Sequence, residues 1–138
     1  MTPLYTTSAV ATGDGRNGHV QTLDGQLVTP VRTPKELGGQ GGGTNPEQLF
    51  AAGYAACFHS ALKVVAQRDG LDVSGTEVSA SVGIGMLDNG GFGLEVQLDV
   101  HAPALDRATA EATVAKAHEV CPYSNATRGN IEVTLTVV

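Results

Sequence analysis

The stretch GGGTNPEQLFAAGYAACFHSALKVVAQRDG, residues 41–70, decides the fold, because it contains the longest apolar run in the chain. Its beginning shows three helix-start signals, namely a capping residue, a proline at the first helical position and an acidic residue in the first turn. These are Thr44 or Asn45, Pro46 and Glu47. The pattern predicts one long helix that runs to about Arg68 and ends at Asp69-Gly70.

This helix is apolar around most of its circumference over residues 49–66, with one narrow polar stripe formed by His59, Ser60 and Lys63. A membrane-spanning helix does not readily carry a lysine in its middle, so we expect a core helix and no membrane partner. One small sheet covers only one side of such a helix. Burial between two subunits, as a homodimer, would cover the rest; the alternative is that a second helix of the same chain covers it.

The segments around the helix predict strands and a second helix. Strands are expected before the helix in LYTTSAVAT (4–12), HVQT and QLVTPVR, with one helical turn at KEL. After it come two long strands, a helix and a closing strand, at about 72–86, 92–102, 105–118 and 130–138. Strands followed by helices, without strict alternation, favour an α+β fold in one domain of residues 1–138.

Composition excludes several classes of protein. The net charge of −6 argues against a nucleic-acid partner, which normally requires a basic face. The N-terminal residues show no basic segment followed by an apolar one, so we expect no secretion signal and a cytoplasmic protein. In that compartment the 2 cysteines indicate thiol chemistry or packing more than a permanent structural disulfide.

Those cysteines, Cys57 and Cys121, are the main candidates for chemistry. A thiol acts as a nucleophile only as thiolate, and burial in an apolar helix raises the pKa of a cysteine, so a reactive Cys57 needs a cation from elsewhere in the fold. Arg16 stands out, because its guanidinium lies in the glycine-rich turn GDGRNG. From composition alone, two inert buried cysteines are the better interpretation.

Two other kinds of site are suggested by residue types but not by their spacing. Cys57 with His59, and His118 with Cys121, are the residue types that zinc prefers, but residues two apart on a helix face opposite ways, so no metal site is expected. The glycine-rich segment before Thr44 has the glycine spacing of a phosphate-binding loop but no lysine, which indicates an ordinary loop.

Two motifs carry a family resemblance: GGGTNPEQLFAAGYAACFHSALK and AHEVCPYSNATRGNIEVTL. Together with PKELGG and GGFGLEVQLDV, they resemble the organic hydroperoxide resistance (Ohr) proteins of the Ohr/OsmC family over essentially the whole chain. The resemblance implies an OsmC-like α+β fold, with antiparallel sheets packed on two main helices in an intertwined homodimer. It implies a thiol-dependent peroxidase that reduces alkyl and fatty-acid hydroperoxides in the response to oxidative stress.

By the same resemblance, Cys57 is the peroxidatic cysteine and Cys121 the resolving one, and they form a disulfide. Glu47 orients the catalytic arginine, Arg16. The family turn commonly reads T-G-G-R-D-G, whereas this chain reads TGDGRNG over residues 12–18, one residue longer before the arginine. No bound cofactor is implied; the co-substrate is a dithiol such as dihydrolipoamide, carried on a lipoylated protein.

Three aromatic residues are candidates for the substrate pocket. Phe50 and Tyr54 share a helix face with Cys57, and Phe92 could join them from the NGGFG turn, although ordinary core packing is as good an interpretation of each. An alkyl tail gains about 0.8 kcal/mol per buried methylene, and hydrogen peroxide gains nothing. Because Glu47 and Cys57 are about 15 Å apart along a straight helix, we expect a break near residues 51–56, at Gly53.

Two alternatives stay open at this point. A thiol sensor or ligand-binding protein could use the same pocket without turnover, and an assignment to the OsmC relatives of the Ohr proteins is the nearest alternative within the family.

Overall fold

The computed structural model describes all residues from 1 to 138. The chain divides into two compact units, Met1–Leu49 and Phe50–Val138.

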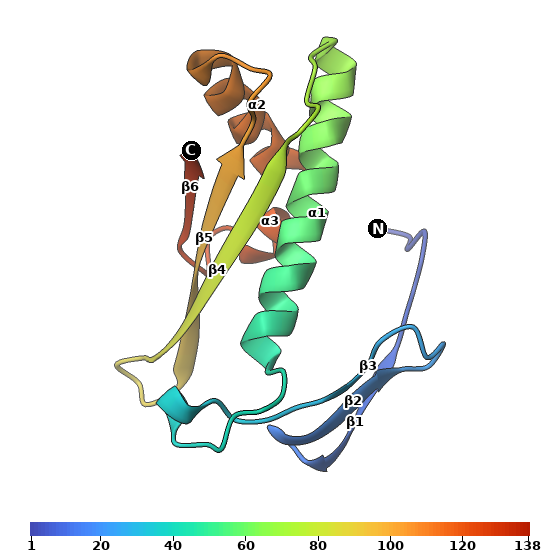
Figure 1. Cartoon of the computed structure of the whole chain (residues 1–138), viewed down its shortest axis with the longest axis vertical. Coiled ribbons are helices and arrows are strands. Elements are labelled where there is room, and N and C mark those ends of the chain that lie inside the picture. Colours follow the sequence, from blue (N-terminus) through green and yellow to red (C-terminus); the bar gives the residue numbers. More distant parts are fainter. The chain divides into compact units, whose positions relative to one another are not determined.

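The first unit is a three-stranded antiparallel sheet of β1 (Ala9–Asp14), β2 (Asn17–Thr22) and β3 (Val28–Pro30), in the order β1-β2-β3. A short 3₁₀ helix, η1 (Lys35–Leu37), follows it, as the sequence predicts. The turn between β1 and β2 consists of two residues, Gly15 and Arg16, because Asp14 pairs with Asn17. Figure 1 shows these strands in blue.

This sheet has a closely packed turn and an exposed first strand. A β-carbon at Gly18 would overlap the carbonyl oxygen of Thr12, so the two strands next to the turn approach closely because this residue is glycine. Every residue of β1 is exposed in the single chain. No residue of β2 or β3 is buried either, so the sheet has no hydrophobic core of its own.

The second unit contains a sheet of β4 (Glu77–Met86), β5 (Phe92–His101) and β6 (Val133–Val137), in the order β4-β5-β6. β4 and β5 form the antiparallel hairpin that the sequence predicts, whereas β6 is parallel to β5. The sheet is thus not wholly antiparallel as expected, because two helices lie between β5 and β6 and return the chain to the same end of the sheet.

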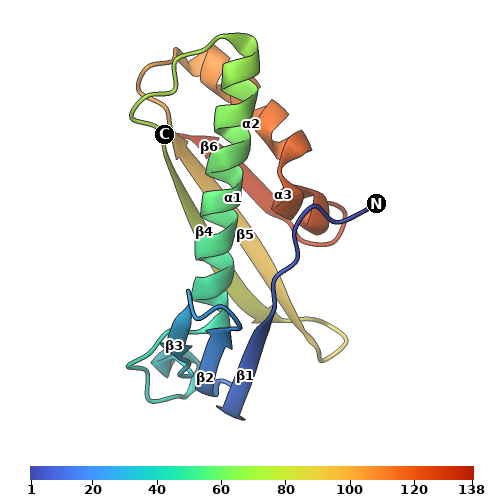
Figure 2. The ribbon, with the colours of Figure 1, turned by 90° about the vertical axis from the view of Figure 1, so that its right-hand side faces the viewer.

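Three helices accompany this sheet. The long helix α1 runs from Pro46 to Asp69, as predicted, and the side chain of Asn45 caps it by accepting the backbone N–H of Gln48 at 2.9 Å. Asp106 caps α2 (Arg107–Val120) in the same way. The six-residue α3 (Pro122–Thr127) follows directly and was not predicted; Figures 1 and 2 both show it near the middle of α1. Pro122 ends α2, since it has no N–H to donate, and starts α3 at its first position.

The core of this unit forms between the helices and one face of the sheet. Val96, Leu98 and Val100 alternate along β5 and therefore point to the same side. They pack against buried residues of both long helices in one cluster. The helix residues are Tyr54, Phe58, Ala61 and Leu62 of α1, and Val114 and Ala117 of α2.

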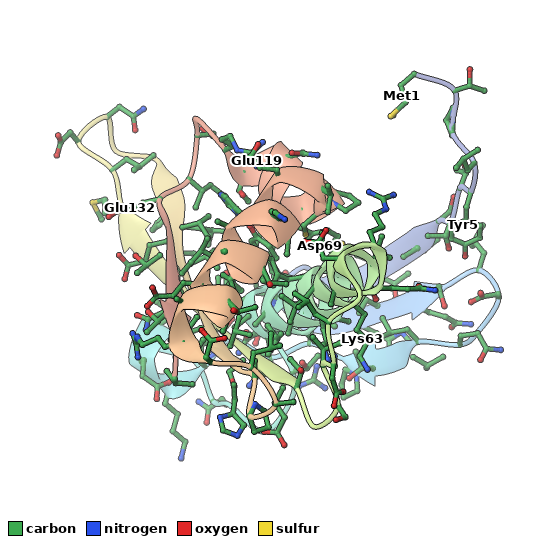
Figure 3. All side chains as sticks on the ribbon, turned by 90° about the horizontal axis from the view of Figure 1, so that it is seen from above. Met1, Tyr5, Lys63, Asp69, Glu119 and Glu132 are labelled. Atoms are coloured by element: carbon green, nitrogen blue, oxygen red, sulfur yellow. The ribbon has the colours of Figure 1, made fainter.

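By length and composition alone α1 could cross a membrane. Its packing gives it another role, because Tyr54, Phe58 and Leu62 are at most 1% exposed inside the core. Lys63 and Asp69 are exposed and lie on different sides of α1, as Figure 3 shows looking along the helix. The carboxylate of Asp69 forms a salt bridge with Lys116 of α2 at 2.6 Å. α1 is the core helix of this unit.

The predicted strand limits are less accurate than the helices. The first strand was expected at 4–12 and begins at Ala9. The strand expected from residue 72 begins at Glu77, because the backbone N–H of Ser74 bonds to the Asp72 carboxylate and the Thr76 hydroxyl bonds to the Val73 carbonyl. These local bonds form a turn in place of strand pairing.

Candidate active site

The two cysteines meet although 64 residues separate them. The thiol of Cys121 donates to the sulfur of Cys57, and the two sulfur atoms are 3.7 Å apart. Both are free thiols; Cys121 is fully buried and Cys57 is partly buried. A disulfide has an S–S length of about 2.05 Å, so the pair needs only a small approach to become covalent.

Each sulfur is held by a different kind of local structure. Cys57 lies in the middle of α1, where Phe58 is buried in the core. Cys121 is the C-cap of α2 and the N-cap of α3, with an extended backbone (φ −66°, ψ 123°). The helix break that Pro122 imposes thus presents the second sulfur toward α1.

The surroundings of Cys57 favour its protonated form. Burial raises the pKa of the Cys57 thiol, the backbone N–H of Tyr123 opposes this by donating to the sulfur, and the neighbouring Cys121 raises it further. The sequence-based expectation that burial raises this pKa is confirmed. A nucleophilic Cys57 therefore requires a cation in addition to the groups around it in this unit.

The predicted break in α1 near Gly53 is wrong, because α1 is one continuous helix from Pro46 to Asp69. Gly53 instead makes room for an aromatic ring. The ring of Tyr123 packs directly over it, and a β-carbon there would lie 2.8 Å from the Tyr123 hydroxyl oxygen. Cys57 consequently does not start a helical segment, and the dipole of α1 does not favour its thiolate as expected.

Of the three aromatic candidates for the substrate pocket, the structure brings two together and leaves the third apart. The rings of Phe50 and Tyr54 are in contact, with centroids 6.1 Å apart, and both pack against Tyr123. Tyr54 is completely buried. Phe92 is 70% exposed at the start of β5. The structure thus brings the first two together in the core beside the cysteines and leaves Phe92 at the surface.

Sequence reasoning missed Tyr123. Its backbone N–H reaches the Cys57 sulfur and its ring joins the aromatic cluster. The signal was its place two residues after Cys121 and directly after Pro122, since a proline at the first position of a helix leaves the next N–H without a helical partner.

Arg16 and Glu47 form a second pair, within the first unit. The guanidinium of Arg16, in the β1–β2 turn, donates twice to the Glu47 carboxylate, at 2.9 and 2.7 Å. The hydrogen bonds from Arg16 lower the pKa of Glu47, against the effect of burial, and the bonds to Glu47 raise the pKa of Arg16. The longer turn still allows this bidentate contact.

No group of three or more histidine, cysteine, aspartate or glutamate side chains in the structure could hold a metal ion. The two histidines near the cysteines in sequence each have a buried ring nitrogen without a hydrogen-bond partner, Nε2 of His59 and Nδ1 of His118. Burial lowers the pKa of His118, and the nearby charge of Arg128 lowers it further.

Residues 39–136 match the family model described as OsmC-like protein. The chain belongs to the OsmC-like family. It is 57% identical to the organic hydroperoxide resistance protein of Xanthomonas axonopodis pv. citri over 97% of this chain and 94% of that protein. It is 46% identical to organic hydroperoxide resistance protein OhrB of Bacillus subtilis, over 96% of each. The predicted resemblance to the Ohr proteins is confirmed.

Solved structures of organic hydroperoxide resistance proteins have the same fold as this chain. An organic hydroperoxide resistance protein from Legionella pneumophila has a TM-score of 0.95 and 54% identity, covering 99% of this chain and 98% of its own. A Vibrio cholerae relative, described with captopril bound in one of its active sites, has a TM-score of 0.93 and 50% identity, covering 99% and 94%. This Ohr-family chain therefore has the expected OsmC-like α+β fold.

Replacing Gly53 with alanine tests the packing of Tyr123. The new β-carbon would push the ring away, and overpacking of this kind costs about 1–3 kcal/mol, more than the gain of about 1 kcal/mol in helix propensity. We expect Gly53→Ala to lower the free energy of unfolding measured by urea denaturation. In a Tyr123→Ala background the same change should instead stabilise the protein by roughly 0.5–1 kcal/mol. If Gly53→Ala stabilised both the wild type and the Tyr123→Ala variant, the packing of Tyr123 on Gly53 would be refuted.

Acid titration tests the Arg16–Glu47 pair. Because its pKa is lowered in the folded state, Glu47 contributes stability above its unfolded pKa of about 4.3, and this is lost as the pH falls through the lower folded value. We expect Glu47→Gln to destabilise the protein near neutral pH and to converge with the wild type in acid. Glu36→Gln, which changes an exposed carboxylate in η1, serves as the control and should change little. An equal difference at both ends of the titration would refute the account.

Proposed function

We propose that this chain is a thiol-dependent peroxidase that reduces organic hydroperoxides in the defence against oxidative stress. The observation that carries the proposal is the contact of the Cys57 and Cys121 sulfurs at 3.7 Å, both as free thiols. The names of its relatives, organic hydroperoxide resistance proteins, support the substrate class.

We assign the chemistry to the cysteines in two steps. The Cys57 thiolate attacks the O–O bond of ROOH, takes one oxygen as a sulfenic acid and releases ROH, with one proton taken up. The thiol of Cys121 then displaces the hydroxyl of the sulfenic acid, so that a Cys57–Cys121 disulfide and water form. The short separation of the sulfurs supports the second step.

Arg16 is proposed as the cation that the thiolate needs. Burial raises the pKa of Cys57, so a positive charge must offset it for attack at neutral pH. A guanidinium can stabilise both a thiolate and peroxide oxygens, and Glu47 orients it through two hydrogen bonds. The guanidinium side chain is 39% exposed, which leaves it accessible to a ligand.

We infer a homodimer from surfaces that the single chain leaves uncovered. All of β1 is exposed, and so is Val28 of β3. A sheet without a core of its own needs another surface to bury it, and a second copy of the chain would supply one. The Vibrio cholerae relative is described as having more than one active site, which fits such an assembly.

The remaining partner is the reductant. Regeneration of the two thiols takes two electrons from an external dithiol, for which we propose the lipoylated protein that the family resemblance implies. No bound cofactor is required by these steps, and a cytoplasmic location is proposed because both cysteines must return to the reduced state.

Turnover by cysteine variants tests the proposal. With dihydrolipoamide as reductant and cumene hydroperoxide as substrate, we expect Cys57→Ser to be inactive. Cys121→Ser should react once with the hydroperoxide and then accumulate over-oxidised Cys57, detected by mass spectrometry. Full activity of Cys57→Ser would refute the proposal. A wild type that oxidises once and does not turn over would instead indicate a thiol sensor.

A further inference from the structure

A buried group of three hydroxyls connects α1 to α3 next to the cysteines. The hydroxyl of Tyr54 lies 2.9 Å from the hydroxyl oxygen of Ser124 and 3.1 Å from that of Thr127. All three residues are at most 2% exposed. Tyr54 is also part of the hydrophobic core cluster that contains Cys121.

The hydrogen bonds in this group have one consistent direction. Thr127 donates its only proton to the carbonyl oxygen of Ser124, so its hydroxyl oxygen must accept from Tyr54. Tyr54 has then used its own proton, and Ser124 must donate to it. Each hydroxyl donates once, and the chain is fully satisfied without water. Buried networks of this kind fix one geometry, because a displaced member would leave an unpaired polar group.

The position of the network relates it to the thiols. Tyr54 precedes Cys57 by three residues on α1, and Ser124 follows Cys121 by three residues in α3, so the network and the sulfur pair are successive contacts between the same two helices. α3 has six residues and is too short to be stable alone. Apolar packing has no directional component, whereas hydrogen bonds one turn away fix both the separation and the orientation of the two helices.

We propose that Tyr54, Ser124 and Thr127 are positioning residues that hold Cys121 within reach of Cys57. They determine how readily the two thiols form a disulfide. A second consequence rests on the proposed peroxidase function. The same residues determine whether the Cys57 sulfenic acid condenses with Cys121, releasing water, or reacts with a second ROOH to give the sulfinic acid and ROH.

Thr127→Val tests this with a closely matched control, Thr113→Val. Both threonines are 2% exposed and donate to a carbonyl within their own helix, but only Thr127 also accepts from Tyr54. In glutathione redox buffers, we expect Thr127→Val to lower the equilibrium constant for the intramolecular disulfide by about fivefold, as expected for one lost buried hydrogen bond, and Thr113→Val to leave it unchanged. An equal effect of both variants would overturn the proposal.

Tyr54→Phe disrupts the same hydrogen-bond network by a change in α1 instead of α3. It provides the test if Thr127→Val does not fold. It should lower the same constant, and the double variant should fall no further than the more affected single one, because the network is lost as a unit. Fully additive effects, or an unchanged constant in Tyr54→Phe, would overturn the proposal.

Pulses of cumene hydroperoxide give the catalytic readout. Thr127→Val should form the sulfenic acid at the wild-type rate and yield about fivefold more sulfinic acid per pulse. An unchanged sulfinic acid fraction would contradict the network's role in the partition. Failure of the wild type to form any disulfide with the hydroperoxide would refute the peroxidase function itself, while the glutathione equilibrium would still decide whether the network positions Cys121.

Discussion

The contact between the middle of α1 and the short α3 is the constraint on which the thiol site depends. Gly53 lets the ring of Tyr123 lie against α1, the hydroxyls of Tyr54 and Ser124 join the two helices, and the sulfurs of Cys57 and Cys121 meet at 3.7 Å. The two cysteines are 64 residues apart in the sequence, and this contact is what brings their sulfur atoms together. Close packing at a glycine and directional hydrogen bonds thus bring the two thiols together inside the core.

Burial in this contact also disfavours the thiolate form of Cys57, which is the nucleophilic form. Burial is the largest influence on the pKa of Cys57 and raises it, and only the backbone N–H of Tyr123 opposes this within the second unit. An apolar setting suits an alkyl hydroperoxide, because the hydrophobic tail gains free energy by leaving water. The same setting makes the thiolate unfavourable. The proposed role of Arg16, held by Glu47 at 2.7 and 2.9 Å, follows from this conflict.

Much of the fold could be predicted from local patterns in the sequence. Capping residues, Pro46 and the apolar run located α1, and alternation located β4 and β5. The break expected at Gly53 was inferred from the distance between Glu47 and Cys57 along a straight helix and was wrong, because this glycine admits the ring of Tyr123 from a distant segment, which no local pattern shows. α3, the parallel pairing of β6 and the place of Tyr123 depend likewise on long-range contacts. The pairing of Cys57 with Cys121 came from the family resemblance, since composition favoured inert cysteines.

The most direct test of the central claim is the fate of both thiols after one equivalent of hydroperoxide. Fully reduced protein, without any reductant, is mixed with cumene hydroperoxide and, in parallel, with hydrogen peroxide, and the products are mapped by peptide mass spectrometry under non-reducing conditions. The account predicts that the organic hydroperoxide consumes both thiols rapidly and yields a peptide pair joined through Cys57 and Cys121 of the same chain, and that hydrogen peroxide reacts far more slowly. Two intact thiols, or a disulfide between the Cys57 residues of two chains, would contradict it.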